Sequence, residues 1–117
     1  MDEETETDTA AIAAVLDDEY ARAILAATSM EPMSATTLSE TCDASPQTIY
    51  RRVDDLKRHE LLTERLQVDP EGNHYAVYTA RLEAVTVRLD DGMFTVEISR
   101  TEPDVADRFT RFVENLR

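Results

Sequence analysis

The sequence contains few of the residues on which several classes of protein depend. It has one cysteine, Cys42, so it can form neither an internal disulfide nor a thiolate metal cluster, and a reducing cytoplasm is the expected location. With only two glycines it has no glycine-rich phosphate loop. No nucleophile–base pair and no apolar run of membrane-spanning length is visible. We therefore expect no catalytic residue, no cofactor, no metal and no membrane contact.

Lysine is almost absent from a strongly acidic chain. There are 25 Asp and Glu residues against 12 basic ones, of which only Lys57 is lysine, and the net charge is −13. This balance resembles that of proteins from halophilic archaea, in which surface carboxylates keep proteins soluble in concentrated salt. An ordinary acidic protein with a basic partner is the alternative.

The chain is long enough for one domain with a single core. Three Phe, four Tyr and no Trp leave most of the core to Leu, Val, Ile and Ala. The acidic residues 1–8 are predicted to form a disordered tail, and the start is unlike a signal peptide. Residues 9–80 are predicted to form a core unit, and residues 81–117 a second hairpin and a C-terminal helix of the same domain.

Three short helices are predicted before the middle of the chain. An Ala-rich helix begins at Asp8 or Thr9, and a second helix, from Glu19 to about Met30, follows a capping Asp18. Ser34 caps a third helix that ends near Cys42, and a tight turn follows.

The segment from Ser45 to Lys57 predicts a helix with two different sides. Ser45 can cap it, and Pro46 occupies the first helical position, where a missing N–H costs nothing. Ile49, Val53 and Leu56 recur at helical spacing and form a narrow apolar stripe. Gln, Thr, Tyr and Arg side chains near the start of such a helix suit reading of the DNA major groove.

Alternating apolar residues predict two hairpins after this helix. Residues 62–68 and 74–79 flank a turn at residues 69–73, and form the wing that follows a helix-turn-helix. Residues 85–89 and 94–98 flank a second turn, and we expect this hairpin to bury one face. Pro103 then opens a last helix.

Residues 14–78 resemble the arsenical-repressor (ArsR) type of winged helix regulator. The resemblance is carried by residues 16–25, by residues 38–53 and by Leu56-Lys57-Arg58-His59-Glu60-Leu61-Leu62, which lead into the wing. It implies an α+β fold and a homodimeric transcription regulator that binds double-stranded operator DNA. The second hairpin and last helix are closer to small halophilic-archaeal regulators with the same core.

The chain departs from that family at the metal-sensing site. Metal-sensing members carry paired cysteines on the helix before the recognition helix, whereas this chain has Cys42 alone. His59 and His74 have no Cys or His neighbours at ligand spacing. Cys42 is either a redox switch or a small core residue, and the second interpretation is favoured because no basic residue is near it.

The expected DNA contacts lie on the recognition helix and the wing. The segment 47–65 holds five of the 12 basic residues, whereas residues 1–46 hold only Arg22 against eleven carboxylates, which favours function over simple solvation. Carboxylates on the same segment and at the wing tip predict cations at the protein–DNA interface. The predicted DNA-binding residues are Ser45, Gln47, Thr48, Tyr50, Arg51, Arg52, Arg58, Arg65, Asn73 and His74.

The last helix has an apolar seam that suits either of two roles. Its 4-3-4 spacing favours packing against a second helix, and the alternative is core packing against the second hairpin. The predicted dimer-interface residues are Ile12, Val105, Phe109, Phe112 and Leu116.

Two functions from different classes follow. The first is a sequence-specific, homodimeric DNA-binding regulator adapted to high salt, with its wing on the flanking backbone or minor groove. The second is a winged helix module that binds other proteins and has lost DNA binding, as the acidic surface would favour.

Overall fold

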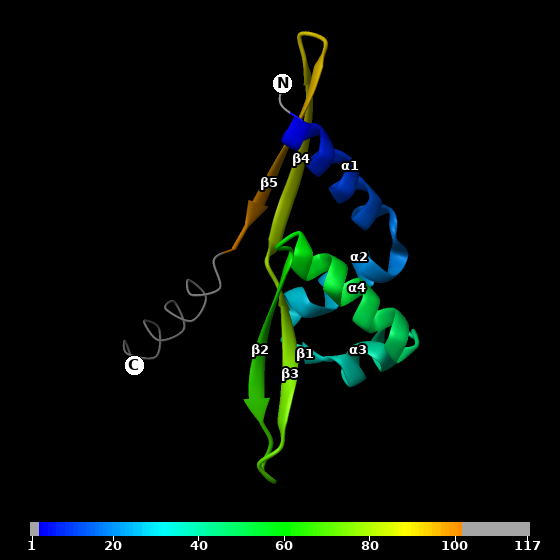
Figure 1. The fold of residues 1–117 in the computed structure, drawn as a ribbon, viewed down its shortest axis with the longest axis vertical. Coiled ribbons are helices and arrows are strands. Elements are labelled where there is room, and N and C mark those ends of the chain that lie inside the picture. The colour runs from blue at the N-terminus through cyan, green and yellow to red at the C-terminus, as the bar shows by residue number, and fades with distance from the viewer. Residues whose placement is uncertain (1–2, 102–117) are drawn as a thin grey trace, which may run out of the picture.

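The computed structural model describes residues 3–101, and for residues 3–8 it describes the backbone alone. Two β-hairpins extend in opposite directions from a small helical body, as Figure 1 shows. The elements are, in order, α1 (Glu3–Asp17), α2 (Glu19–Met30), β1 (Met33–Ser34), α3 (Ala35–Thr41), α4 (Pro46–Arg58), β2 (Leu62–Val68), β3 (His74–Ala80), β4 (Leu82–Asp90) and β5 (Met93–Arg100).

Three helices begin at the capping residues that the sequence predicts. The Asp18 carboxylate accepts from the Ala21 N–H at 2.7 Å at the start of α2. The hydroxyls of Ser34 and Ser45 accept from backbone N–H groups at the starts of α3 and α4. Such caps satisfy N–H groups that have no partner inside the helix. The caps of α2, α3 and α4 are thus confirmed.

Helices α3 and α4 form the helix-turn-helix. The turn between them contains Asp43 with a φ of 50°, and the Ser39 hydroxyl donates to the Ala44 carbonyl oxygen. Asp and Asn tolerate this left-handed conformation better than most residues with a side chain. The turn sets α4 across the body, where one side packs inward and the other faces outward (Figure 1).

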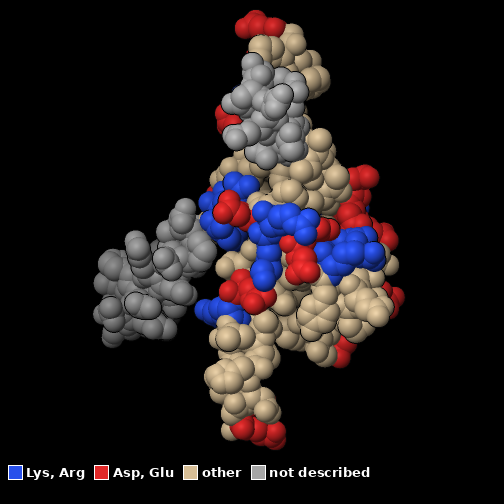
Figure 2. Space-filling model, viewed as in Figure 1, with Lys and Arg blue, Asp and Glu red and all other residues tan. Residues whose placement is uncertain are grey.

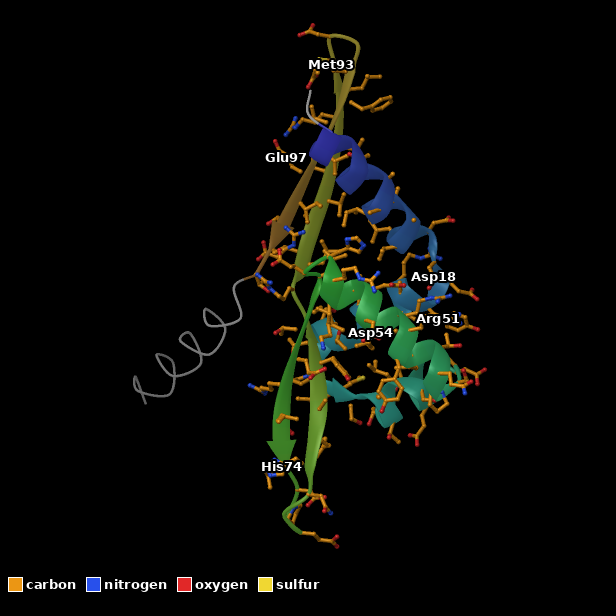
Figure 3. All side chains as sticks on the ribbon, in the orientation of Figure 1. Asp18, Arg51, Asp54, His74, Met93 and Glu97 are labelled. Atoms are coloured by element: carbon orange, nitrogen blue, oxygen red, sulfur yellow. The ribbon has the colours of Figure 1, made fainter. Side chains whose placement is uncertain are left out.

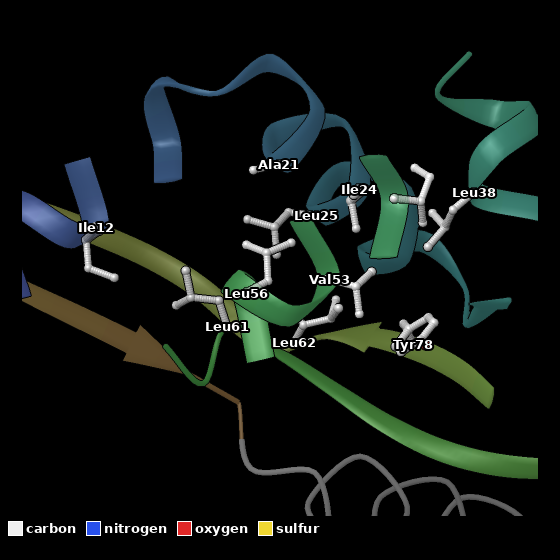
Figure 4. Packing of buried hydrophobic residues seen from close by; sticks show 11 residues of the cluster. Ile12, Ala21, Ile24, Leu25, Leu38, Val53, Leu56, Leu61, Leu62 and Tyr78 are labelled. Atoms are coloured by element: carbon white, nitrogen blue, oxygen red, sulfur yellow. The ribbon is translucent and has the colours of Figure 1, made fainter. Parts of the chain in front are cut away.

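The core lies between the helices and the root of the first hairpin. Its most deeply buried members include Leu38, Ile49, Leu56 and Leu61, all at 0 % exposure. The buried Thr28 hydroxyl donates to the Ile24 carbonyl oxygen at 2.7 Å, so this polar group is satisfied. Figure 4 shows this apolar cluster between the helices and the strands that follow them.

Strands β2 and β3 form the wing, and β1 extends the same antiparallel sheet in the order β1-β3-β2. Glu64 lies opposite Tyr78, and Leu66 lies opposite Ala76. At the tip, the Asp69 carboxylate accepts from the backbone N–H groups of Glu71 and Asn73, at 2.9 and 2.8 Å. An aspartate side chain of this kind replaces backbone hydrogen bonds within a turn.

Among the strands of residues 3–101, β4 and β5 pair only with each other. Asp91 and Gly92 at the tip both have positive φ, 52° and 79°, which is the requirement of the two-residue turn that matches strand twist. At the root, the Arg100 guanidinium donates to the carbonyl oxygens of His59 and Glu60, at 3.0 and 3.1 Å. The second hairpin is thereby attached to the C-terminal end of α4.

The structure confirms an α+β winged helix-turn-helix with a second hairpin, and it corrects two predictions. Helix α1 begins at Glu3 rather than near Thr9, so it includes residues 3–8, which were assigned to a disordered tail. Acidic residues are favourable at a helix N-terminus, which accounts for the earlier start. The second hairpin does not bury one whole face, because Leu89 and Phe94 are exposed. The predicted helix after Pro103 lies outside the described residues.

Candidate nucleic-acid interface

The outward side of α4 presents polar side chains. Gln47, Tyr50, Arg51 and Asp54 are exposed, whereas the apolar stripe on the opposite side of the helix is buried. Ser45 caps the helix as expected. The Thr48 hydroxyl lies 3.0 Å from the Ser45 hydroxyl, and Thr48 is therefore part of the cap. Figure 3 shows Arg51 and Asp54 along this helix.

Arg52 is not on the exposed side of α4. Its Nε donates to the Asp18 carboxylate at 2.8 Å, and both side chains are about three-quarters buried. The hydrogen bond from Arg52 lowers the pKa of the Asp18 carboxyl, and the same contact raises the pKa of Arg52. Asp18 therefore caps α2 and joins it to α4. Arg52 as a DNA contact stays a prediction, and its position also suits holding the recognition helix against α2.

The other two basic side chains near the end of α4 have carboxylate partners. Lys57 binds Glu64 of β2 at 2.9 Å, and Arg58 binds Asp55 at 3.4 Å. Arg51, by contrast, makes no ion pair or side-chain hydrogen bond with any of residues 9–101, whose side chains the structure describes. Figure 2 shows this alternation, with basic and acidic side chains interspersed across the middle of the visible face.

Tyr78 lies on β3 of the wing, and its side chain packs into the core beneath α4. It is 4 % exposed, and burial, followed by the nearby Glu64 carboxylate, raises its pKa to about 12. Tyr50 and Asp54 of α4 contribute smaller effects in the same direction. Together with the Lys57–Glu64 ion pair, this places the Glu64 face of the wing on the side of α4.

The wing has two faces, and the predicted residues divide between them. Successive side chains along a strand point to opposite faces of the sheet. Arg65, which lies opposite Val77, is therefore on the face away from Glu64 and α4. Arg65 thus lies behind the surface that α4 and the wing share. Asn73 and His74 are exposed at the tip, where Figure 3 shows His74.

Two apolar wing residues were missed by the sequence reasoning. Leu66 and Val68 lie on the same face as Glu64 and are 66 % and 58 % exposed. Their alternation with polar residues was visible in the sequence, but it was interpreted only as evidence for a strand. Exposed apolar side chains beside a recognition helix are able to contact sugars or thymine methyl groups.

Helices α1, α2 and α4 line an open pocket of about 340 Å³, and the Arg52–Asp18 pair forms part of its wall. Its small lining residues include Ala11, Ala14 and Ala21, and His59 lies at its edge. Cys42 lies elsewhere: it packs against the core, and burial raises the pKa of its thiol. A raised pKa disfavours the reactive thiolate, which agrees with the interpretation of Cys42 as a core residue.

Of the predicted dimer-interface residues, the structure describes only Ile12. Ile12 is 3 % exposed and belongs to the core cluster of its own chain, so its side chain is not available to a partner. It packs inward because α1 lies against the root of the second hairpin. Val105, Phe109, Phe112 and Leu116 lie outside the described residues.

The fold and its exposed recognition helix define a winged helix-turn-helix protein. A family model described as a helix-turn-helix domain matches residues 16–65, which contain α2, α3, α4 and the first half of β2. No curated protein matches the chain. The match supports a DNA-binding regulator in general terms. Within residues 3–101, no helix is both long and apolar enough to cross a membrane.

Proposed function

We propose that the protein is a sequence-specific transcription regulator that acts as a homodimer on double-stranded DNA. Helix α4 enters the major groove, and the wing contacts the flanking backbone or minor groove. The protein works in the cytoplasm at high salt, where its excess of carboxylates keeps it soluble.

The observation that carries this proposal is the pair of exposed side chains Gln47 and Arg51 on α4. They are four residues apart, so they lie on one side of the helix and about one turn from each other. Gln can make two hydrogen bonds to adenine, and Arg can make two to guanine. Since Arg51 has no carboxylate partner within residues 9–101, no ion pair with these residues has to break before it contacts a base.

The homodimer follows from how helix-turn-helix proteins read DNA. Two copies of α4 must be spaced by about one DNA turn to contact successive half-sites. We assign the interface to the seam of the predicted last helix, which comprises Val105, Phe109, Phe112 and Leu116.

Cations complete the proposed interface. Asp54 and Glu64 lie on the side of α4 and the wing that would face DNA, and Glu71 is exposed at the wing tip. Placing DNA phosphates next to these carboxylates is unfavourable, because like charges repel, unless cations lie between them.

One observation favours a different function, a module that binds proteins. Three of the four basic side chains on α4 are already paired with carboxylates of the chain, as in Arg52–Asp18 and Lys57–Glu64. These pairs reduce the positive charge available to phosphates. Duplex binding at high salt distinguishes the two functions.

The test selects a bound sequence from a random duplex library in molar salt and then measures variants. We expect Gln47→Ala and Arg51→Ala each to weaken specific binding by about 1–3 kcal/mol per half-site, because each loses a paired base contact. Arg88→Ala is the matched control, since Arg88 is an exposed arginine on β4, in the other hairpin. If all three variants bind the selected duplex with the affinity of the parent and melt at the same temperature, α4 is not the element that reads the DNA sequence.

A further inference from the structure

The second hairpin has an apolar face that the described chain leaves uncovered at its outer half. Directly paired residues bring Val87 next to Val96 and Leu89 next to Phe94 on one side. Val87, Leu89 and Phe94 are 60–63 % exposed. Three large apolar side chains side by side, rather than scattered singly, mark an interaction surface.

The inner half of the same face is already covered. Val85 and Ile98 pack against the core cluster, and Ile98 lines a small cavity together with Ile12 of α1. Helix α1 gives no apolar cover further out along the hairpin: the positions one turn before Ile12 are Asp8 and Thr9, both polar. The outer half therefore needs a partner from elsewhere.

We propose that this outer face binds residues 103–117 of a second copy of the chain, in a reciprocal exchange. The inference rests on the proposed homodimer but not on DNA binding. The segment carries an apolar residue at positions 105, 109, 112 and 116, which as a helix form one seam about 16 Å long. The uncovered pairs run from Val96 to Phe94, about 7 Å along the strand, so the part of the seam around Phe109 and Phe112 is long enough to cover them.

The position at which the described chain ends favours exchange over cover by the same copy. Strand β5 runs from tip to root, and Thr101 is held at the root, where its N–H donates to the Arg81 carbonyl oxygen at 2.7 Å. A return of the same chain along this hairpin would begin at the inner half of the face, where Ile12 of α1 already lies beside Ile98.

Two arginines of this segment suit the acidic hairpin tip, while Asp104, Asp107 and Glu114 make the segment neutral as a whole. The hairpin tip carries Asp90 and Asp91, whereas Arg108 and Arg111 are each adjacent in sequence to a Phe of the seam. Paired with these carboxylates, the arginines would form a polar rim around an apolar centre, the usual arrangement of an interface.

Disulfide trapping tests which chain covers the face. In a Cys42→Ser background, one protein carries Leu89→Cys and a second carries Phe112→Cys. We expect the mixed proteins to form a covalent heterodimer under mild oxidation, visible on a non-reducing gel. The control replaces Leu89→Cys by Thr86→Cys, an exposed position on the other side of β4, and should trap far less.

A chain with both cysteines separates the remaining outcomes. A covalent dimer supports exchange, whereas a disulfide within one chain overturns it in favour of cover by the same copy. If sedimentation shows a dimer but neither cysteine pair forms a disulfide, the interface lies elsewhere and the exchange is overturned. If sedimentation shows a monomer at all concentrations, the homodimer itself is overturned. Sedimentation should also show at least about a tenfold weaker dimer for Phe94→Ser, an exposed position that the protomer core does not need.

Discussion

Both hairpins bury apolar side chains at the root and expose others further out, and they differ in how each is attached to the helical body. The wing sends Leu62 and Tyr78 into the core at its root, and the Lys57–Glu64 ion pair ties it to α4. The second hairpin is tied to the body by Arg100 and by half-buried residues, and it exposes Leu89 and Phe94. Similar alternation in the sequence thus produces one hairpin whose exposed apolar residues lie beside the recognition helix and one whose exposed apolar residues lie far from it, since the hairpins extend in opposite directions (Figure 1).

The tips differ in a comparable way. In the wing, Asp69 uses its carboxylate to hold the turn, and Glu71 is the exposed charge. In the second hairpin the turn depends on the positive φ of Asp91 and Gly92. Figure 3 shows that His74 and Met93, one near each tip, lie at opposite ends of the molecule. A substitution at one end is therefore a control for the other.

The largest expected difference in stability is between a variant of the buried Leu62 in the wing and one of the exposed Leu89 in the second hairpin. Leu62→Ala should lower the free energy of unfolding by about 2–5 kcal/mol, because it removes a side chain from the core. Leu89→Ala should cost less than about 1 kcal/mol within the protomer, since that side chain is mostly exposed.

Urea unfolding at several protein concentrations measures both costs. Any further loss in Leu89→Ala should depend on protein concentration, because it then reflects a weaker dimer. Equal, concentration-independent losses in the two variants would contradict the distinction between a packed hairpin and an uncovered one.

The second prediction concerns high pH at the wing root. Tyr78 has its pKa raised to about 12 in the fold, against 10.0 for an ordinary tyrosine. The unfolded chain releases this proton first, so the stabilisation is complete below pH 10 and is lost as the pH rises towards 12. The loss should be about 2 kcal/mol, a value in line with two pKa units at a buried site.

Unfolding between pH 9 and 12 tests this origin. Tyr78→Phe should flatten the dependence, whereas Tyr75→Phe, an exposed tyrosine on the same strand, should keep it. A parent and a Tyr78→Phe protein with the same pH profile would show that another group is responsible.

The sequence predicted local features well because they depend on neighbours in the chain. The caps at Asp18, Ser34 and Ser45 and the apolar stripe of α4 need only residues a few positions apart. The partner of Arg52 is 34 positions away, so its role could not be derived from spacing. The same holds for the exposed Leu89 and Phe94: alternation predicts a face, and only the packing of other elements decides whether that face is covered.

The smallest expected effect is on the salt dependence of DNA binding, and it compares a carboxylate of the wing with one of the second hairpin. Each phosphate contact contributes about −0.9 to the slope of log affinity against log salt, and cations taken up beside carboxylates oppose it. With Arg52 held by Asp18 and Arg65 on the far face of the wing, we expect a slope no steeper than roughly −2, the counterion release of one arginine charge per subunit, that of Arg51 in the groove.

Glu71→Gln should make this slope more negative by up to about one per subunit, because one cation per subunit is no longer taken up. Glu71 is preferred to Asp69 as the test residue, since the Asp69 carboxylate holds the turn and its loss would alter the wing itself. Glu97→Gln, an exposed carboxylate on the side of the second hairpin away from Phe94, should leave the slope unchanged. Calorimetric titrations across a salt series measure all three proteins. If Glu71→Gln and Glu97→Gln shift the slope equally, net charge rather than the wing's position governs the salt response.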